Sequence, residues 1–313
     1  MDLRMTMEHV AQKIPRAFER YRKIIPGFEG FEESLRLRPP VCIRVNTLKI
    51  GVDPFGSLMS EQGYDLEPVE GMEEAFLLDG VDSPGSTLEY FLGYYHVQGL
   101  ASMLPAKILD PQRGEVILDL CAAPGGKATH LAQLMQNQGL VVANDVTIDR
   151  ISVLRSHIDR LGTTSLLVCR YQGHNFPTRT AFQRVLVDPP CSAEGTYRLG
   201  PQLPLTEDPE KARMLGGLQR RLVKRALDVL KPGGTLVYST CTYAPEENEA
   251  VVNEVVADGR AEVLPIRIPF PHSPGLTSWG EETYHPTLIR CVRIYPHQMN
   301  SWGFFIAYLR KSR

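Results

Sequence analysis

The stretch Val-Ile-Leu-Asp-Leu-Cys-Ala-Ala-Pro-Gly-Gly-Lys, residues 116–127, decides the fold of this chain of 313 residues. A short apolar run ends at Asp119 and passes into a turn of small residues, and a helical pattern follows directly. A buried strand that leads through a glycine turn into a helix is typical of a nucleotide-binding α/β unit. Gly125 and Gly126 carry no Cβ, so they let the backbone approach a ligand closely.

The turn differs from the two common phosphate-binding loops, because it is neither Gly-x-Gly-x-x-Gly nor Gly-x4-Gly-Lys-Ser/Thr. We therefore expect an adenosine-type ligand that needs no pyrophosphate, and S-adenosylmethionine meets that description. The residues expected to contact it in the turn are Cys121, Ala122, Ala123, Pro124, Gly125, Gly126 and Lys127.

Strand and helix patterns alternate from residue 114 onward. The expected strands are 116–120, 140–145, 165–170, 184–188 and 236–239, the helices 128–136, 147–161 and 213–230, and a final hairpin 288–295 with 303–310. The alternation predicts an α/β fold, a Rossmann-like doubly wound sheet with an antiparallel hairpin at its end. We divide the chain into a small N-terminal α+β module, residues 1–92, and a main domain, residues 93–313.

Composition excludes several classes of protein. No apolar run approaches the ~20 residues that cross a bilayer, and the N-terminus lacks a secretory pattern. We expect a cytoplasmic, monomeric protein without membrane contact. The six cysteines form no C-x-x-C pair, so we expect neither a metal site nor a disulfide framework.

Charge is unevenly distributed along the chain, although its net value is only −2. Residues 51–90 contain ten Asp or Glu and no Lys or Arg. A polyanion would avoid this segment and bind basic groups elsewhere. The basic faces of the expected helices 5–24 and 213–230 are either solvated or in contact with phosphates, and the sequence leaves both readings open.

Polar residues follow several of the expected strands at the edge where ligands of such sheets bind. Asp145 ends the second strand about 20 residues after the glycines, where an acid commonly holds ribose hydroxyls. The alternative, a helix N-cap, is less favoured here. Arg150 follows in the next helix and could support the carboxylate.

Two further strand ends carry cysteines. Asp188-Pro-Pro-Cys191-Ser follows one strand, and Ser-Thr-Cys241-Thr follows another. A single cysteine of this kind is more often inert packing than a nucleophile. Two at the same edge of one sheet suggest chemistry, and the prolines fix where Asp188 and Cys191 point.

A thiol, a carboxyl group and a methyl donor in one crevice suit methylation of a pyrimidine at C5. A thiolate that adds to C6 makes C5 nucleophilic, and an acid near N3 stabilises the charge that develops on the ring. From the residues alone, either Cys241 or Cys191 could be the nucleophile, with Asp188 as the acid. Lys127 is a candidate to lower the pKa of the thiol.

At these residues the sequence resembles the RNA cytosine-C5 methyltransferases of the Sun, or nucleolar-protein, family. The resemblance rests on the glycine turn, on both cysteine motifs, and on Arg-Val-Asn-Thr-Leu-Lys at 44–49. It extends to Tyr-Tyr-His-Val-Gln-Gly-Leu-Ala-Ser-Met at 94–103 and to the segment 293–307. The family is dependent on S-adenosylmethionine, so the resemblance implies that donor and an RNA substrate.

The resemblance implies roles for individual residues. Cys241 would attack C6, and Cys191 would act afterwards to release the product. Asp188 would hold the N3 and N4 edge of the cytosine, helped by the Pro190 carbonyl group. Lys127 would lie near the base.

On the donor side, the resemblance implies that Asp145, Arg150 and Asp188 contribute to the site, and that the N-terminal module recognises RNA. One position departs from the family: Gln172 stands where an Asp usually meets the adenine amino group. An amide oxygen can still accept that hydrogen bond, so we expect binding to survive in weaker form.

A base inside an RNA stem must be flipped out to reach such a crevice. Tyr197 and Arg198 are candidates to stabilise the flipped state, and an ordinary ordered loop is the equally weighted alternative. The leading hypothesis is methylation of a cytosine in RNA, with tRNA favoured over rRNA. The rivals are a catalytically silent RNA-binding or ribosome-assembly factor on the same fold, and a methyltransferase acting on small molecules or proteins.

Overall fold

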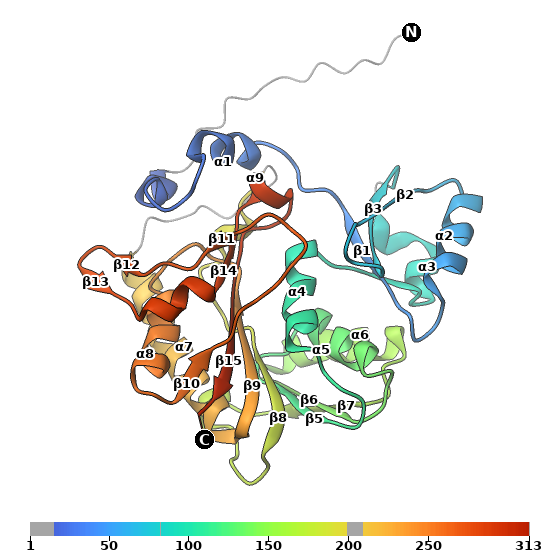
Figure 1. Cartoon of the computed structure of the whole chain (residues 1–313). Helices are drawn as coiled ribbons and strands as arrows, with labels where there is room; N and C mark the ends of the chain where they lie inside the picture. The colour runs from blue at the N-terminus through green and yellow to red at the C-terminus, as the bar shows by residue number, and fades with distance from the viewer. Residues whose placement is uncertain (1–15, 82, 199–208, 313) are drawn as a thin grey trace.

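A large mixed sheet forms the centre of the molecule, as the computed structural model shows for residues 16–81, 83–198 and 209–312 (Figure 1). Its path runs β11-β14-β15-β9-β8-β5-β6-β7, with β10 paired to β15. The bounds are β5 Val116–Asp119, β6 Leu140–Asp145, β7 Leu166–Arg170, β8 Phe182–Val187, β9 Leu230–Thr240, β10 Ala261–Val263, β11 Ser273–Pro274, β14 Val292–Ile294 and β15 Phe304–Lys311.

Strands β5 to β9 are parallel to one another, and β15 pairs with β9 in antiparallel register. The predicted doubly wound sheet and its final antiparallel hairpin, β14 with β15, are therefore confirmed. β5 lies between β6 and β8, so the loops that follow β5 leave the sheet where the strand order reverses. Such a switch point is where open α/β sheets bind their ligands.

Helices cover both faces of the large sheet because its strand residues alternate between two apolar cores. Ile117 packs in one core and its neighbour Leu118 in the other. One face carries α4 Leu100–Leu109, α5 Gly126–Leu134 and α6 Ile148–Leu161, and the other carries α7 Pro209–Val229 and α8 Glu249–Ala257 (Figure 1). None of the described helices is long and apolar enough to span a bilayer.

A second, smaller sheet has the order β2-β3-β1-β4 and is antiparallel throughout. Its elements are β1 Cys42–Val45, α2 Val52–Glu61, β2 Asp65–Pro68, β3 Ala75–Asp79, α3 Leu88–Phe91 and β4 Tyr95–Val97. Ile43, Phe55 and Tyr95 are fully buried in its own core. β4 lies past residue 92, so the small sheet extends beyond the expected boundary.

The N-terminal segment packs away from the small sheet. A 3-10 helix, η1 Arg16–Tyr21, and α1 Phe28–Leu35 share an aromatic cluster with Tyr243 and Tyr295 of the C-terminal half. Figure 1 shows α1 beside the short α9, Pro296–Met299. The expected helix 5–24 lies outside the described residues up to 15, and its remainder is the 3-10 turn. The division of the chain at residue 92 stays a prediction.

The remaining elements are short. They are η2 Pro84–Ser86, η3 Gly173–Asn175, η4 Glu194–Thr196, β12 Ser278–Trp279, β13 Glu282–Thr283 and η5 Pro286–Arg290.

Candidate active site

Two adjoining cavities open at the carboxyl ends of the parallel strands. The larger has a volume of about 290 Å³ and the smaller about 70 Å³, and Cys121 lines both. Of the expected site residues, the larger is lined by Cys121, Ala122, Ala123, Pro124, Gly126, Lys127, Asp188 and Cys241. The smaller is lined by Cys121, Asp145, Arg150, Gln172 and Pro190. Gly125 is the N-cap residue of α5 and has a φ of 111°, a conformation that favours glycine.

The two cysteine motifs lie close together at the carboxyl ends of β8 and β9. The sulfur atoms of Cys191 and Cys241 lie 3.4 Å apart, and neither forms a disulfide. Cys241 lines the larger cavity, whereas Cys191 is absent from that lining. The arrangement places one thiol at the wall of the cavity and the second within hydrogen-bond distance of the first.

An ion pair lies beside the thiols. Lys127 Nζ is 2.7 Å from Asp188 Oδ2, and Ser239 Oγ donates to Asp188 Oδ1 at 2.9 Å. The ammonium group also lies 5.3 Å from the centre of the Phe304 ring. Although burial opposes its charge, the carboxylate of Asp188 keeps the pKa of Lys127 raised. The larger cavity therefore presents a carboxylate and an ammonium group side by side.

The pKa of Cys241 lies below the ordinary value for a thiol. The first cause is the hydrogen bond from Cys191, which stabilises the Cys241 thiolate; burial and Asp188 oppose the effect, and Lys127 adds to it. The pKa of Cys191 moves upward, because Cys241 and burial both disfavour its charge. Lys127 contributes as expected, but the partner thiol contributes more. The pair thus separates into a nucleophile, Cys241, and a proton-bearing partner, Cys191.

Asn248 holds the residues on both sides of Cys241. Its Oδ1 accepts from Thr240 Oγ1 at 2.5 Å, and its Nδ2 donates to the Thr242 carbonyl group at 3.0 Å. Ser192 Oγ and Thr242 Oγ1 lie 2.6 Å apart, which links this segment to the loop that carries Cys191. The separation of the two sulfurs is therefore set by side-chain contacts of both loops.

Glu247 and Gln219 fix the loop of Cys191. Glu247 Oε2 accepts from the Ser192 backbone N–H at 3.0 Å and from Gln219 Nε2 at 2.9 Å. The same amide of Gln219 donates to the Pro190 carbonyl group at 2.9 Å. Both side chains are fully buried. Backbone atoms on either side of Cys191 are thus held by two side chains from α7 and the segment before α8.

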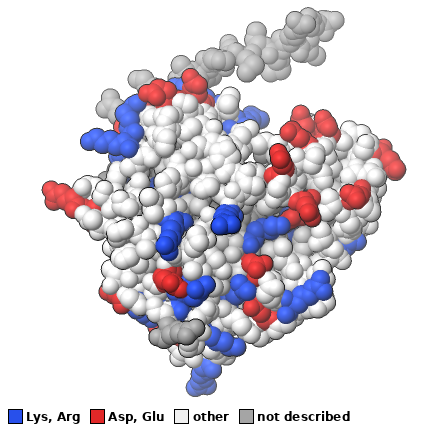
Figure 2. All heavy atoms as spheres, in the orientation of Figure 1, with Lys and Arg blue, Asp and Glu red and all other residues white. Residues whose placement is uncertain are grey.

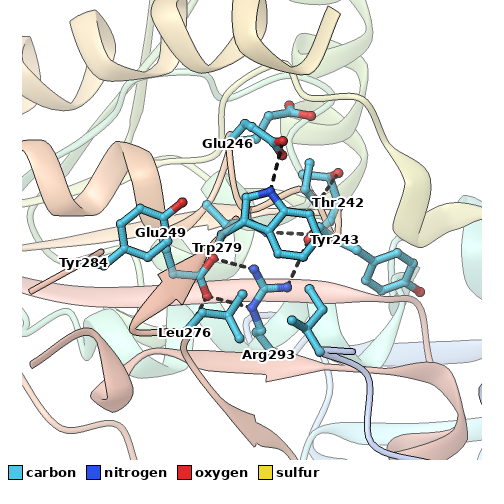
Figure 3. A network of polar contacts seen from close by, with 12 residues as sticks. Thr242, Tyr243, Glu246, Glu249, Leu276, Trp279, Tyr284 and Arg293 are labelled. Carbon is cyan, nitrogen blue, oxygen red and sulfur yellow. Dashed lines mark hydrogen bonds and ion pairs between the residues drawn. The ribbon is translucent and has the colours of Figure 1, made fainter. Parts of the chain in front are cut away.

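A buried ion pair contacts the backbone of Tyr243, two residues after Cys241. Figure 3 shows the Arg293 guanidinium between Glu249 and the backbone of Tyr243. Arg293 Nε donates to Glu249 at 2.6 Å, its second nitrogen donates to Tyr243 O at 3.0 Å, and Leu276 N binds the same carboxylate. Glu249 and Arg293 are almost completely buried. Their pairing avoids the large cost of an isolated buried charge.

On the side of the smaller cavity, Asp145 is held by the glycine turn. Its Oδ2 accepts from the Ala123 backbone N–H at 3.1 Å and lies 3.4 Å from Arg150, which also donates to Ala123 O at 2.6 Å. Its Oδ1 accepts from Val146 N at 2.8 Å. The expected support of Asp145 by Arg150 is confirmed, and lone pairs of the carboxylate remain for hydroxyl groups of a ligand.

Arg198 was expected to stabilise a flipped RNA base, and the structure shows that this expectation is wrong. Tyr197, named for the same role, packs against the N-terminal segment. Arg198 is only 1% exposed, and it donates to Leu37 O at 3.1 Å and Asn300 Oδ1 at 3.0 Å. Tyr197 packs edge-on against Phe18, with ring centres 5.5 Å apart, and lines neither cavity. Arg198 therefore ties the N-terminal segment to the C-terminal loops and is shielded from RNA. Both residues of this loop are therefore engaged in contacts with other parts of the chain, which their sequence did not indicate.

The basic face of α7 is largely compensated. Arg220 and Lys224 both pair with Glu254 of α8, and Arg225 donates to His174 O at 3.1 Å. These partners favour the reading of a solvated face over a phosphate-binding one.

Several polar residues that line the larger cavity were not predicted as site residues, among them Asp119 and His96. The Cys121 backbone favours the charge on Asp119, yet neither carboxyl oxygen makes a hydrogen bond of normal geometry to a described residue. Burial and the charge of Asp188 raise the pKa of Asp119 to about 7. Asp119 could have been predicted as a site residue from the sequence, because it ends a strand at the edge where ligands bind.

Acidic side chains gather over the small sheet, at the upper right in Figure 2. The exposed acidic residues of this part of the chain are Asp53, Glu61, Asp65, Glu67, Glu70, Glu73 and Asp79. Lys and Arg side chains lie nearer the middle of the same face. This face of the small sheet therefore repels phosphates, as the charge distribution along the chain predicted.

The sheet and the glycine turn beside an acidic strand end define an α/β methyltransferase fold. A crystal structure of a methyltransferase homolog protein from Pyrococcus horikoshii shares 32% sequence identity with this chain. It superposes with a TM-score of 0.81 over 96% of this chain and 100% of that one.

The chain belongs to the family described as 16S rRNA methyltransferase RsmB/F, whose model matches residues 106–310. The model of the N-terminal domain of RsmF matches residues 14–100.

Two relatives differ in how much of their length the chain spans. A tRNA (cytosine(49)-C(5))-methyltransferase of Pyrococcus abyssi is 36% identical, with 100% of both chains covered. A mouse 28S rRNA (cytosine-C(5))-methyltransferase is 37% identical over 90% of this chain, which spans only 36% of that protein.

Proposed function

We propose that this protein transfers a methyl group from S-adenosylmethionine to C5 of a cytosine in RNA, through a covalent bond between Cys241 and C6. The observation that carries the proposal is the contact of the Cys191 and Cys241 sulfurs, 3.4 Å apart, with Cys241 on the same cavity as the Lys127–Asp188 pair. Family membership supports it. A silent RNA-binding factor has no need of two such thiols.

The residues around the two cavities fit the donor. Asp145 offers carboxylate lone pairs to ribose hydroxyls, and Gln172 offers an amide to the adenine. The unpaired carboxyl group of Asp119 suits a cationic group, because a buried charge needs a partner. When bound, S-adenosylmethionine supplies an electrophilic methyl group. Cys121, which lines both cavities, marks the place where they adjoin.

The chain's own groups then act on the cytosine. The Cys241 thiolate adds to C6, and the ring electrons move toward N3, where the Lys127–Asp188 pair can supply a proton or a hydrogen bond. C5 becomes nucleophilic and takes the methyl group. This transfer leaves S-adenosylhomocysteine. A base then removes the C5 proton, which restores the double bond between C5 and C6 and expels the Cys241 thiolate, and the proton supplied to N3 returns to the Lys127–Asp188 pair.

Cys191 serves the last step. Its proton lies within hydrogen-bond distance of the Cys241 sulfur, so it stabilises the thiolate as the leaving group. The pKa directions agree with this division, since Cys191 keeps its proton where Cys241 loses one.

We favour tRNA as the substrate. The relative that the chain matches along its whole length is named as a tRNA methyltransferase. A cytosine in rRNA is the second candidate, because the family description and the mouse relative name rRNA.

The proposal is tested by bisulfite sequencing of tRNA and rRNA incubated with S-adenosylmethionine and the protein. The wild type should protect a defined cytosine from conversion, and Cys241→Ala should lower protection at least ~10³-fold, since the nucleophile is lost. The control is Cys42→Ala, in β1 and outside both cavity linings. Methylation by Cys241→Ala at the wild-type rate would refute the mechanism.

A further inference from the structure

His96 presents a fixed hydrogen-bond donor to the larger cavity. The side chain is 7% exposed and lines that cavity. Its Nδ1 lies 3.0 Å from a nitrogen of the Arg160 guanidinium group, which can only donate. Nδ1 is therefore the acceptor, and the ring proton sits on Nε2. No hydrogen-bond partner of Nε2 occurs among the described residues.

The Nε2–H group of His96 lies close to the first residue of α5. A Cβ atom added to Gly126 would lie 3.3 Å from His96 Nε2, so the imidazole edge approaches the first residue of this nine-residue helix. The helix directs its unpaired backbone N–H groups to the same end. Both features favour a negatively charged group at this point of the cavity.

Two arginines behind His96 reinforce the positive potential. Arg160 donates to the carbonyl groups of Tyr90 at 2.7 Å and Tyr95 at 3.0 Å. Arg44, 1% exposed, donates to Gln98 Oε1 at 3.1 Å and to other amide, carbonyl and hydroxyl oxygens. Among the described residues, neither guanidinium group has a carboxylate within ion-pair distance. Their positive charge favours an anion in the cavity, although Glu74 offsets part of the charge of Arg44.

The opposite charge lies in the same cavity. Asp119 is buried there without a normal hydrogen-bond partner, as described above. A ligand with both an ammonium and a carboxylate group would satisfy Asp119 and His96 together. The amino-acid end of S-adenosylmethionine has both groups, whereas an RNA phosphate offers only the anion.

We propose that His96 is a donor-recognition residue whose Nε2–H binds the carboxylate of the amino-acid end of S-adenosylmethionine. The inference rests on the proposed function, since it assumes that donor. It assigns the small sheet, whose strand β4 carries His96, a part in donor binding.

Isothermal titration with two probes tests the assignment. S-adenosylhomocysteine carries the amino-acid end, and 5′-methylthioadenosine lacks it. His96→Ala should weaken binding of S-adenosylhomocysteine by about tenfold and binding of methylthioadenosine by less than about twofold. His96→Gln, whose amide can donate from a similar position, should recover most of the loss. His272→Ala is the control, because His272 is exposed and lines neither cavity.

Each other outcome overturns the assignment. Equal losses for both probes would show that His96 acts only through the fold. Unchanged binding of both probes, with weaker retention of RNA in a filter assay, would assign the anion to an RNA phosphate. A wild-type protein that binds neither probe would refute the proposed donor itself, which is a separate failure.

Discussion

The sulfur of Cys241 owes its reactivity to a second sulfur more than to a nearby cation. Its pKa is lowered first by the hydrogen bond from Cys191 and only further down by Lys127. Burial and Asp188 work against the thiolate. Because the favourable contact is short and direct, removal of Cys191 should be felt in the free protein, before any RNA is bound.

The pH dependence of alkylation tests this coupling. In Cys191→Ala the thiolate of Cys241 loses its donor, so its pKa should rise. The midpoint of Cys241 modification by iodoacetamide should therefore move to higher pH. Peptide mass spectrometry separates Cys241 from the other cysteines. Lys127→Met should give a shift in the same direction but smaller, and the reverse order would contradict the assignment of the main cause.

For single residues, the sequence predicts well which residues at the strand ends lie together. It predicts poorly which side chains are buried and what they contact. Cys241, Asp188 and Lys127 were expected together because parallel strands bring their carboxyl ends to one edge. The burial of Arg198 was not predictable, because its partners at residues 37 and 300 are far away in the chain. The same applies to His96, whose role depends on Arg160.

Among the elements, the segment between β9 and α8 organises the site. Glu247 holds the loop of Cys191, Asn248 holds the residues around Cys241, and Glu249 pairs with Arg293. Three consecutive polar side chains thus serve three different parts of the site. Their sequence signal was a Pro-Glu-Glu-Asn-Glu run at the start of a helix, which gave no hint of the partners.

The Glu249–Arg293 pair should matter for stability. Glu249→Gln leaves a buried guanidinium group without its carboxylate, so the free energy of unfolding should fall by about 3–5 kcal/mol. Urea denaturation measures the change. The matched control is Glu262→Gln, which removes an exposed partner of Arg310 at 3.0 Å and should change stability by less than about 1 kcal/mol. Similar losses in both variants would contradict the importance of the buried pair.

Strand and helix positions in the large sheet agree with the expected ones, because their apolar periodicity is strong. The N-terminal region was harder to predict. Phe18 and Tyr21 were expected on one face of a helix 5–24, yet they lie in a 3-10 helix and pack in a cluster with Tyr243 and Tyr295. The partner surface, which lies more than 200 residues away, decides that conformation.

For the whole molecule, three parts of the chain converge on one site. The large sheet supplies the thiols and the ion pair, the small sheet supplies His96, and the N-terminal segment braces the cysteine loops. Tyr21 Oη, for example, donates to Glu194 at 2.8 Å, and the same carboxylate accepts from Thr242, beside Cys241. None of the exposed acidic residues of the small sheet lines either cavity, and their charge disfavours contact with RNA.

The most direct measurement of the central claim is the mass of the protein bound to its RNA. Cys191→Ala should transfer the methyl group but release the product slowly, since the leaving thiolate has lost its hydrogen-bond donor. After incubation with tRNA and S-adenosylmethionine, a denaturant-resistant complex should accumulate. Nuclease and protease digestion should then give a peptide in which Cys241 carries a methylated cytidine. An adduct on any other residue, or no adduct while methylation continues at the wild-type rate, would contradict the attack of Cys241 on C6.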